Sequence, residues 1–394
     1  MEDNFHLDID CQQLFHHGDM ICGDVFLSRR IKEENRTIVI LSDGMGSGVK
    51  ANVLATLTAS MALNFTMEHK DFKTIAEIIM NTLPICSVRK VSYSTFTIVD
   101  IEYDGTTRIM EFDNPDCVVM RGSTFFDPGW ENIELDSEEN KGKVLRACQF
   151  KARKEDRILF WSDGIMQSGM GSQAYPFGWG LDNVVEFVTQ NIKSLPYISS
   201  NALGRKIVKR ASRNDQDEPK DDTSAGVIYF REPRKLLLCT GPPFEMDKDS
   251  ELAMRIYHFK GKKIICGGST AEIVSRELGL KFAPGMNITD PELPPIAYME
   301  GINLVTEGIL TIGKVARILE DYDNNYNLGE GPADQIVHYL LQSDQISIIN
   351  GTRINFAHQD PSLPVELEIR RTVVKRVVRL LEEKFLKDVN LSFI

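Results

Sequence analysis

The chain has 394 residues, of which 42% are hydrophobic and 26% are charged, a balance typical of globular proteins. Because this length exceeds that of most single domains, we expect two domains, each with its own core. The formal net charge of -12 argues against general binding to nucleic acids or anionic membranes. No apolar run approaches the roughly 20 residues of a membrane-spanning helix, and the acidic start MEDNFHLDID lacks a signal-peptide pattern. We therefore expect a cytoplasmic protein.

The cysteines and histidines form no recognisable disulfide or zinc pattern. The seven cysteines are scattered without any C-x-x-C pair, and the seven histidines include no H-x-x-x-H pair. An odd number of cysteines at irregular spacing favours reduced thiols over a disulfide framework. A zinc site is not expected either.

The first half of the chain is predicted to consist mainly of strands, with helices between them. Thr37–Leu41 is an apolar, β-branched run that stops at Ser42-Asp43-Gly44, which indicates a buried strand followed by a turn. Asp104-Gly105 joins the segments Ser94–Tyr103 and Thr106–Asp113 in a hairpin. The other expected strands are Val118–Gly122, Arg157–Trp161 and Ala225–Phe230, and the expected helices are Val49–Phe65, Asp71–Thr82, Leu181–Gln190 and Leu203–Ser212.

The polar, proline-containing segment Arg231–Lys235 marks the predicted domain boundary, which divides the chain into residues 1–232 and 233–394. Beyond it strands alternate with helices, as in a small α/β domain. The expected strands are Leu236–Cys239, Lys263–Cys266, a strand through Leu304, and Ile346–Ile349. Five helices are expected. Two of them end near Phe259 and Leu278, and the other three span Lys314–Asp321, Pro332–Gln342 and Arg370–Phe385.

Four short acidic motifs carry the predicted chemistry: Gly23-Asp24, Asp43-Gly44-Met45-Gly46, Asp163-Gly164 and Asp221-Asp222-Thr223-Ser224. Two follow apolar strands and one begins a strand, so their carboxylates can converge at one edge of a sheet. Glycine beside three of them lets a cation or a phosphate approach the backbone. Hard oxygen ligands in this number favour Mg²⁺ or Mn²⁺. A single Asp-Gly after a strand is usually a simple turn, but four such motifs in these positions are hard to explain that way.

A pair of divalent cations would suit the hydrolysis of a phosphoester. Two cations lower the pKa of a bridging water, hold the resulting hydroxide in line with phosphorus, and offset charge on the phosphoryl oxygens. The sequence has no Cys-x5-Arg loop and no evident Ser/His arrangement. This agrees with a reaction that needs no protein nucleophile.

These motifs resemble those of a known family. GDVF at 23–26, ILSDGMGSG at 40–48, FWSDGI at 160–165 and DDTSAGV at 221–227 are similar to the successive motifs of SpoIIE-like phosphatases. These enzymes are the bacterial branch of the type 2C metal-dependent protein phosphatases, and the resemblance covers roughly residues 8–230. It implies an α+β protein whose first domain is a β-sandwich of two antiparallel sheets flanked by helices, with a smaller α/β domain behind it. The motifs DNPD at 113–116, GPP at 241–243, CGGST at 266–270, LVTEGI at 304–309 and NFAHQ at 355–359 resemble a subgroup with such a C-terminal extension.

The resemblance also implies the roles of individual residues. Asp43 is expected to bridge both cations, with the Gly44 carbonyl on the first. Asp24 helps to bind the first cation through water, while Asp163 and Asp221 hold the second. Asp43 and Asp24 are therefore the expected catalytic residues.

Other positions have less definite expected roles. Asp222 is expected beside the ligands rather than on a cation, and Arg29, Gly46 and Ser47 are candidate contacts for phosphate or substrate. A solvated surface arginine is the alternative for Arg29. Met45 stands where eukaryotic relatives have a histidine, proposed as general acid, so the sequence leaves the proton donor for the leaving serine unidentified.

The leading interpretation is hydrolysis of phosphoserine or phosphothreonine on a regulatory protein by a metal-bridging hydroxide. The family implies that partners are often small anti-sigma-factor antagonists of the STAS type. One alternative is a non-catalytic signalling or binding module that uses the phosphatase fold to recognise a partner, and another is hydrolysis of a small phosphorylated metabolite. Retention of all four aspartates favours the enzyme.

The second domain is expected to be either a sensor that controls the site or a dimerisation element, the latter giving a homodimer. Within it, Gly267-Gly268-Ser269-Thr270 follows a strand and starts a helix. Backbone N–H groups in such a position can bind a phosphate. The alternative is a tight turn in which Ser269 or Thr270 caps the helix.

Overall fold

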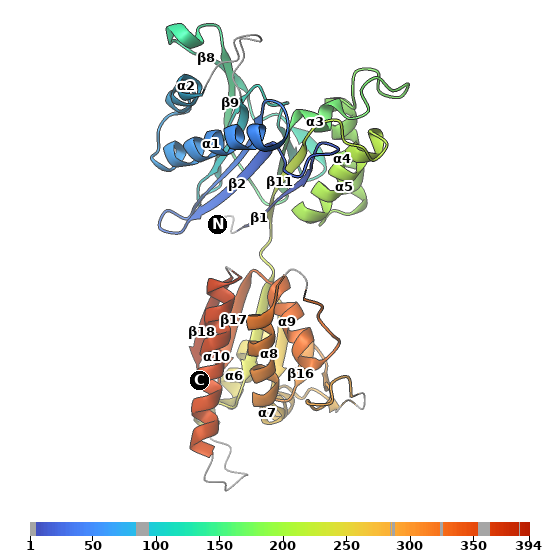
Figure 1. Ribbon diagram of the computed structural model, residues 1–394. Helices are drawn as coiled ribbons and strands as arrows, with labels where there is room; N and C mark the ends of the chain where they lie inside the picture. Colours follow the sequence, from blue (N-terminus) through green and yellow to red (C-terminus); the bar gives the residue numbers. More distant parts are fainter. Residues whose placement is uncertain are drawn as a thin grey trace. The chain divides into compact units, whose positions relative to one another are not determined.

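The computed structural model describes residues 5–83, 94–283, 285, 288–323, 326–353, 363–385 and 387–394. The chain divides into two compact units, Met1–Glu232 and Pro233–Ile394 (Figure 1). Cys86 and the NFAHQ motif lie outside the described residues, and the six cysteines inside them are free thiols. Of the helices described, none has the length and apolar character needed to cross a bilayer.

The first unit is a sandwich of two antiparallel sheets, which confirms the predicted α+β fold. In spatial order, one sheet consists of β1 (His6–Leu14), β11 (Thr223–Arg231), β10 (Asp156–Trp161), β6 (Val118–Arg121) and β7 (Thr124–Phe126). The other consists of β2 (Asp24–Ile31), β3 (Arg36–Gly44), β4 (Ser94–Ile101), β5 (Thr106–Phe112), β9 (Val144–Lys151) and β8 (Glu131–Glu134).

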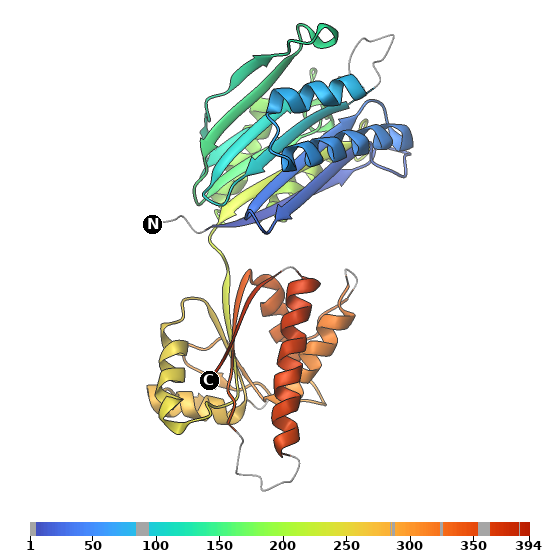
Figure 2. The ribbon, with the colours of Figure 1, turned by 90° about the vertical axis from the view of Figure 1, so that its left-hand side faces the viewer.

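Helices cover the outer face of each sheet. The pair α1 (Gly48–Met67) and α2 (Phe72–Thr82) lies side by side over the β2–β3–β4 sheet (Figure 2). On the β10–β11 sheet pack α4 (Leu181–Ser194) and α5 (Ser200–Asn214), and the short helix α3 (Asp163–Gln167) directly follows β10. A single turn of 3₁₀ helix spans Glu138–Asn140.

Strand β3 is buried on both faces. Ile38 and Ile40 contribute to the core under α1 and α2, whereas Val39 and Leu41 contribute to the core between the two sheets. Because neighbouring side chains of a strand point to opposite faces, only a continuous apolar run can satisfy both cores. This explains why the segment predicted as a buried strand shows no polar alternation.

The sequence patterns do not predict every strand. β1 is half-buried along its whole length and contains both polar and apolar residues. Its position in the sheet is set by pairing with β11 from His6 to Leu14. β9 alternates in burial and pairs with β5 and β8. Such strands are specified by their neighbours in the sheet more than by their own composition.

The second unit is a doubly wound α/β structure, in agreement with the predicted alternation of strands and helices. Its parallel sheet has the spatial order β16 (Leu304–Thr306), β13 (Lys262–Cys266), β12 (Lys235–Thr240), β17 (Gln345–Asn350) and β18 (Asp388–Phe393). One core contains residues of α6 (Asp249–His258) and α7 (Gly268–Leu278). The other contains residues of α8 (Ile309–Asp321), α9 (Pro332–Gln342) and α10 (Leu363–Glu383). The remaining elements are a 3₁₀ turn at Met246–Lys248 and a small antiparallel pair, β14 (Phe282–Ala283) and β15 (Tyr298–Met299).

A buried ion pair joins three elements of the first unit. Arg36 at the start of β3 is 2% exposed and Asp100 on β4 is 1% exposed. The guanidinium donates from Nε to Asp100 Oδ1 at 2.7 Å and from Nη2 to Oδ2 at 2.8 Å. Nη2 also donates to the carbonyl oxygen of Thr66 at 2.8 Å, which ties β3 to the end of α1.

Replacing Asp100 by asparagine should destabilise the first unit by about 3–5 kcal/mol, because it leaves the Arg36 charge buried without a full partner. Urea unfolding followed by circular dichroism would measure the change. The matched control is Asp136→Asn, which removes an ion pair with Lys73. The Asp136 side chain is 79% exposed, so this substitution should have little effect on the free energy of unfolding. Equal effects of the two substitutions would contradict the role assigned to the buried pair.

Candidate functional site

Strand pairing brings the four acidic motifs toward one end of the sandwich. Asp24 opens β2 and lies directly opposite Asp43, near the end of β3. Asp163 follows the end of β10, and Asp221 precedes the start of β11, which is the antiparallel neighbour of β10. The sheet topology therefore places these side chains together although they are far apart in the chain.

Three of these aspartates line a single cavity of about 510 Å³: Asp43, Asp163 and Asp221. The other lining residues are His16, Met45, Gly46, Ser47, Ser94, Thr95, Asp113 and Lys220. Asp24 does not line the cavity but is 3% exposed. Its charge acts on Asp43 across the β2–β3 pair. The site thus has three of the motif carboxylates and Asp113 at the cavity, with the carboxylate of Asp24 buried beside it.

Burial raises the pKa of all four carboxyl groups. The pKa of Asp24 is raised to about 7 and that of Asp221 to about 6, in both cases mainly by loss of water. The pKa of Asp43 is raised well above its ordinary value by burial and then by the charges of Asp24, Asp163 and Asp221. Burial also raises the pKa of Asp163. At neutral pH the cluster therefore favours bound protons or bound cations.

The oxygen atoms present fit divalent cations. Asp24 Oδ1 and Asp222 Oδ2 are buried and have no hydrogen-bond partner among the described residues. A buried acceptor without a partner costs about 1–3 kcal/mol, and more when it is charged, so a cation would relieve that cost. Carboxylate oxygens are the ligands that Mg²⁺ and Mn²⁺ prefer. Within the described ranges, however, no three His, Cys, Asp or Glu side chains are already gathered as a metal site.

Hydrogen bonds hold the acidic side chains in place. Ser224 Oγ donates to Asp24 Oδ2 at 2.6 Å, and Gln13 Nε2 donates to Ser224 Oγ at 2.9 Å. Gln167 Nε2 donates to Asp163 Oδ2 at 2.7 Å. The orientation of two of the four carboxylates is therefore fixed by neutral side chains.

Asp222 lies behind the cavity, between β10 and the segment before β2. Its Oδ1 accepts a hydrogen bond from the backbone N–H of His16 at 3.1 Å, and its carbonyl oxygen accepts one from Ser162 Oγ at 3.3 Å. It is 2% exposed and is not among the residues that line the cavity. A place beside the ligands, rather than on a cation, stays a prediction.

The glycines of the Asp-Gly motifs are needed for backbone packing. A Cβ atom on Gly44 would lie 2.1 Å from the carbonyl oxygen of Ala51 in α1. A Cβ atom on Gly164 would lie 2.3 Å from the carbonyl oxygen of Asp222. Any larger residue would therefore push apart the elements that carry the carboxylates.

The structure does not bring every candidate residue to the cavity. Gly46 and Ser47 line it, but Arg29 is exposed on β2 and pairs with Ile38, five residues along the strand from Asp24. At about 3.4 Å per residue this is roughly 17 Å away. Lys220, which directly precedes Asp221, is instead the basic residue among the cavity-lining residues. Its position next to an acidic motif was the signal that could have identified it.

Two further lining residues were not predicted as site residues. His16 lines the cavity, and its Nδ1 lies 3.4 Å from Asp19 Oδ2. Asp113 directly follows β5 and also lines the cavity, with a left-handed φ of 54°. His16 belongs to no acidic motif, so only the folded arrangement reveals its place. Asp113 begins the DNPD motif after a largely buried strand, and that position was a signal that could have identified it.

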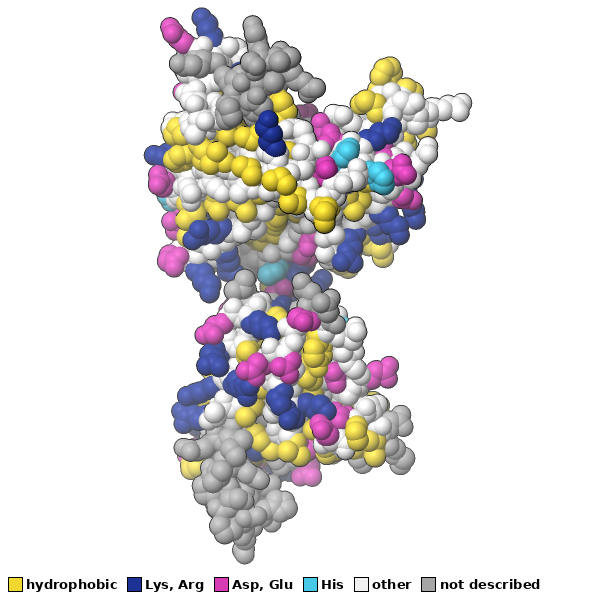
Figure 3. Space-filling view, in the orientation of Figure 1, with side chains coloured by type: hydrophobic (Ala, Val, Ile, Leu, Met, Phe, Trp, Pro, Cys, Tyr) yellow, Lys and Arg dark blue, Asp and Glu magenta, His cyan; other side chains and the backbone are white. Residues whose placement is uncertain are grey.

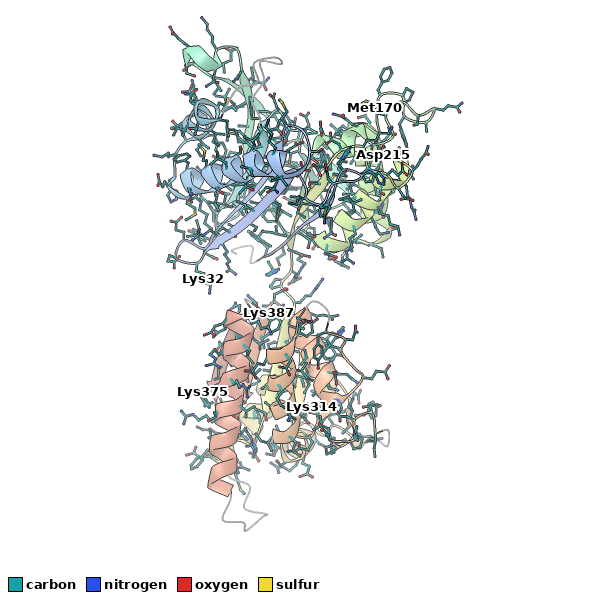
Figure 4. All side chains as sticks on the ribbon, in the orientation of Figure 1. Lys32, Met170, Asp215, Lys314, Lys375 and Lys387 are labelled. Atoms are coloured by element: carbon teal, nitrogen blue, oxygen red, sulfur yellow. The ribbon has the colours of Figure 1, made fainter. Side chains whose placement is uncertain are left out.

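The glycine-rich segment 168–180 is anchored at its base. The N–H of Gly169 donates to Asp215 Oδ1 at 2.7 Å, and Lys220 Nζ donates to the carbonyl oxygen of Met170 at 3.0 Å. Figure 4 labels Asp215 and Met170, one residue of each contact. Farther along, Phe177 is 92% exposed. A cavity residue thus holds one end of a segment that presents an aromatic side chain to solvent.

Comparison with known families supports the motif pattern. The SpoIIE family model, described as Stage II sporulation protein E, matches residues 33–231. No curated protein matches the chain.

Several solved structures have a similar arrangement. One contains the PP2C phosphatase domain and a fragment of the regulatory domain of SpoIIE from Bacillus subtilis, with 15% identity, a TM-score of 0.47 and 58% of this chain covered. The chain spans 64% of that structure, which is less than two thirds. Another contains the RsbU and RsbW domains of Rv1364c from Mycobacterium tuberculosis, with 14% identity, a TM-score of 0.46 and coverage of 64% of this chain and 67% of that one. A third is RsbX in complex with magnesium, with 18% identity, a TM-score of 0.40 and coverage of 58% and 98%.

Replacing Asp24 by asparagine should stabilise the metal-free protein at pH 7, on the order of 2 kcal/mol. The pKa of Asp24 in the folded state, about 7, lies above its ordinary value of 3.8, so the folded protein holds the proton more tightly than the unfolded chain. The contribution of this group to stability is therefore greatest below about pH 4 and is lost as the pH rises to about 7. Urea unfolding in EDTA at both ends of this range would measure it. A variant less stable than the wild type at pH 7 would contradict the assignment.

Proposed function

The chain belongs to the SpoIIE family, and we propose that its first unit is a metal-dependent phosphatase that hydrolyses phosphoserine or phosphothreonine on a regulatory protein. The buried cluster of Asp24, Asp43, Asp163 and Asp221 carries the proposal. So many carboxylates, with pKa values raised by burial, need compensating positive charge to be ionised together at neutral pH. Divalent cations supply that charge.

Asp43, Asp163 and Asp221 would hold two Mg²⁺ or Mn²⁺ ions at the cavity, together with the carbonyl oxygen of Gly44. Asp24 would support the first ion from the interior, oriented by Ser224. When bound, the two ions would activate a water molecule and offset charge on the phosphoryl oxygens.

The cavity also has features that suit a phosphate group. Helix α1 begins at Gly48, and its N-cap Ser47 lines the cavity together with Gly46. The free N–H groups and the dipole at a helix N-terminus attract anions. Lys220 adds a positive charge at the same cavity. These groups would orient the phosphate, and His16 is a candidate for the proton donor that Met45 cannot be.

An exposed apolar stripe beside the cavity supports a protein substrate over a small metabolite. It consists of Val49, Val53 and Leu57, spaced four residues apart on α1 and exposed by 63%, 59% and 44% (Figure 3). Exposed apolar rows of this kind are typical of surfaces that contact other macromolecules. The proposed partner is a small phosphorylated regulator, of which the STAS-type anti-sigma-factor antagonists are one class.

Asp43→Asn should lower metal-dependent phosphatase activity about a hundredfold or more, because it removes the carboxylate expected to contact both cations. The assay is hydrolysis of an aryl phosphate and of a phosphoserine peptide with Mn²⁺, Mg²⁺ or EDTA. Arg29→Gln is the matched control, since Arg29 is exposed away from the cavity and should leave activity near the wild-type level.

The alternative, a binding module without turnover, predicts a different result. A folded wild-type protein with no activity on either substrate, with any of the metals and with added phosphorylated partner, would contradict the phosphatase proposal. Activity that persists in EDTA or in Asp43→Asn would contradict the metal assignment.

A further inference from the structure

The strands of the second unit end in one row. The register pairs Thr240 with both Cys266 and Asn350, and Cys266 with Thr306, so β12, β13, β16 and β17 stop at the same level. In chain order, the strands run outward from β12 to β13 and β16, and the chain then returns to the other side of β12 with β17 and β18. In open α/β sheets, ligands bind beyond the carboxyl ends of the strands where the order reverses, here between β12 and β17.

Buried polar side chains gather at this row. Thr240, Thr270 and Thr311 are each 0% exposed, and Asn350 is 2% exposed. In the part of the chain that the structure describes, the Oγ1 atoms of these threonines and Oδ1 of Asn350 have no hydrogen-bond partner. The same holds for Glu307 Oε2, one residue beyond the end of β16. We call these five residues the strand-end site.

Most of the strand-end site faces one side of the sheet. Leu238 and Ile348 belong to the core formed with α8, α9 and α10. Because side chains alternate along a strand, Thr240 and Asn350, two residues farther on, point to the same side. Thr311 lies in the first turn of α8, and Thr270 lies in the first turn of α7, after β13. Thr240, Asn350 and Thr311 therefore form a polar layer at one end of the core with α8, whereas Thr270 belongs to the helix that packs in the other core.

Such a layer is costly unless something pairs with it. Native proteins leave few buried polar atoms without partners, because the lost hydrogen bonds to water must be replaced. An apolar side chain at each of these positions would lose no hydrogen bonds to water on burial. Five unpartnered polar atoms along the carboxyl ends of these strands, with Thr240 and Asn350 at the switch point itself, thus indicate a surface shaped for a polar molecule, with enclosed water as the competing explanation.

The loops at these strand ends bring backbone close to the site. A Cβ atom on Gly267 would lie 4.0 Å from the backbone nitrogen of Gly241, and one on Gly308 would lie 3.5 Å from Gly267 Cα. A Cβ atom on Gly241 would lie 2.6 Å from Arg370 Nη1. The glycines therefore allow the loops at the strand ends to pack closely, and the Arg370 guanidinium lies beside Gly241.

These groups define the chemistry of the bound molecule. Gly267 and Gly308 are the N-caps of α7 and α8, and neither contributes a side-chain cap. Two helix N-termini and the charge of Arg370 favour an anion. Glu307 Oε2 and Asn350 Oδ1 can only accept hydrogen bonds, so they require donors such as hydroxyl groups.

A dinucleotide does not fit the first turn of this sheet. The segment after β12 reads Gly241-Pro242-Pro243 and lacks the G-x-G-x-x-G spacing that dinucleotide-binding turns use. Its two prolines have no N–H to offer a pyrophosphate. A single phosphate at the turn Gly267-Gly268-Ser269-Thr270 meets no such obstacle.

We propose that the second unit binds a small phosphorylated sugar, such as a mononucleotide, at the strand-end site. The phosphate lies at the N-terminus of α7 near Arg370, and the sugar hydroxyls donate to Asn350 at the end of β17. The threonine hydroxyls complete the polar contacts. This assignment does not depend on the phosphatase activity of the first unit.

Thermal unfolding and titration calorimetry of the full chain in EDTA would test the proposal, with ribose 5-phosphate, AMP, inorganic phosphate and ribose as probes. Ribose 5-phosphate or AMP should raise the unfolding midpoint, and inorganic phosphate and ribose should act more weakly. Asn350→Leu and Thr240→Val should each weaken binding about tenfold. Thr240→Val should also raise the midpoint of the ligand-free protein, because it removes a buried hydroxyl that has no partner.

Ser343→Ala is the matched control in the same unit. Its hydroxyl is buried but donates to the carbonyl oxygen of Tyr339 at 2.7 Å, so its loss should lower the midpoint and leave ligand binding unchanged. No response to either sugar phosphate, or an equal response in Asn350→Leu, would overturn the proposal. A ligand-free Thr240→Val protein less stable than the wild type would point to enclosed water and would likewise overturn it.

Discussion

The complete burial of β3 constrains the whole first unit. One face of this strand packs against the opposing sheet and the other against α1 and α2, so three layers must assemble before its apolar side chains leave water. The same strand carries Asp43 directly before its last residue, Gly44, which places a carboxylate at the end of the sandwich. The stability of the first unit and the geometry of the candidate site therefore both depend on β3. The apolar cores that contain β3 offset the free-energy cost of bringing the acidic side chains together.

The parts of the fold that could be predicted are the strands whose burial on both faces requires a continuous run of apolar residues. Thr37–Leu41 and Leu236–Cys239 are buried on both faces, and their continuous apolar runs show it. β1 and β18 could not be predicted, because half-buried edge strands carry mixed residues and take their register from β11 and β17. The spatial order of the parallel strands could not be predicted from the sequence either, because it depends on the edge of the sheet to which each connection leads.

The candidate site shows the same division. The motifs named Asp43, Asp163 and Asp221, and these do line one cavity. Their glycines were attributed to close approach by a cation, whereas Gly44 and Gly164 have a sufficient reason in backbone packing. Lys220 could have been identified because it directly precedes Asp221, whereas the distance of Arg29 from the cavity depends on its position along β2, which charge patterns in a sequence do not encode.

The double burial of β3 has a consequence for the accuracy of folding. The hydrophobic pattern of a strand that is apolar on both faces does little to fix its register. A shift of two residues relative to the neighbouring strands would leave similar side chains on each face. Such a slip would move Asp43 by roughly 7 Å from its place opposite Asp24. The polar contacts at the two ends of the strand, Arg36 with Asp100 and Ser42 Oγ with Ser94 Oγ at 2.7 Å, are satisfied in one alignment only. These contacts set the register, and the position of Asp43 follows from it: the Arg36–Asp100 pair lies at the far end of the strand, whereas Ser94 itself lines the cavity.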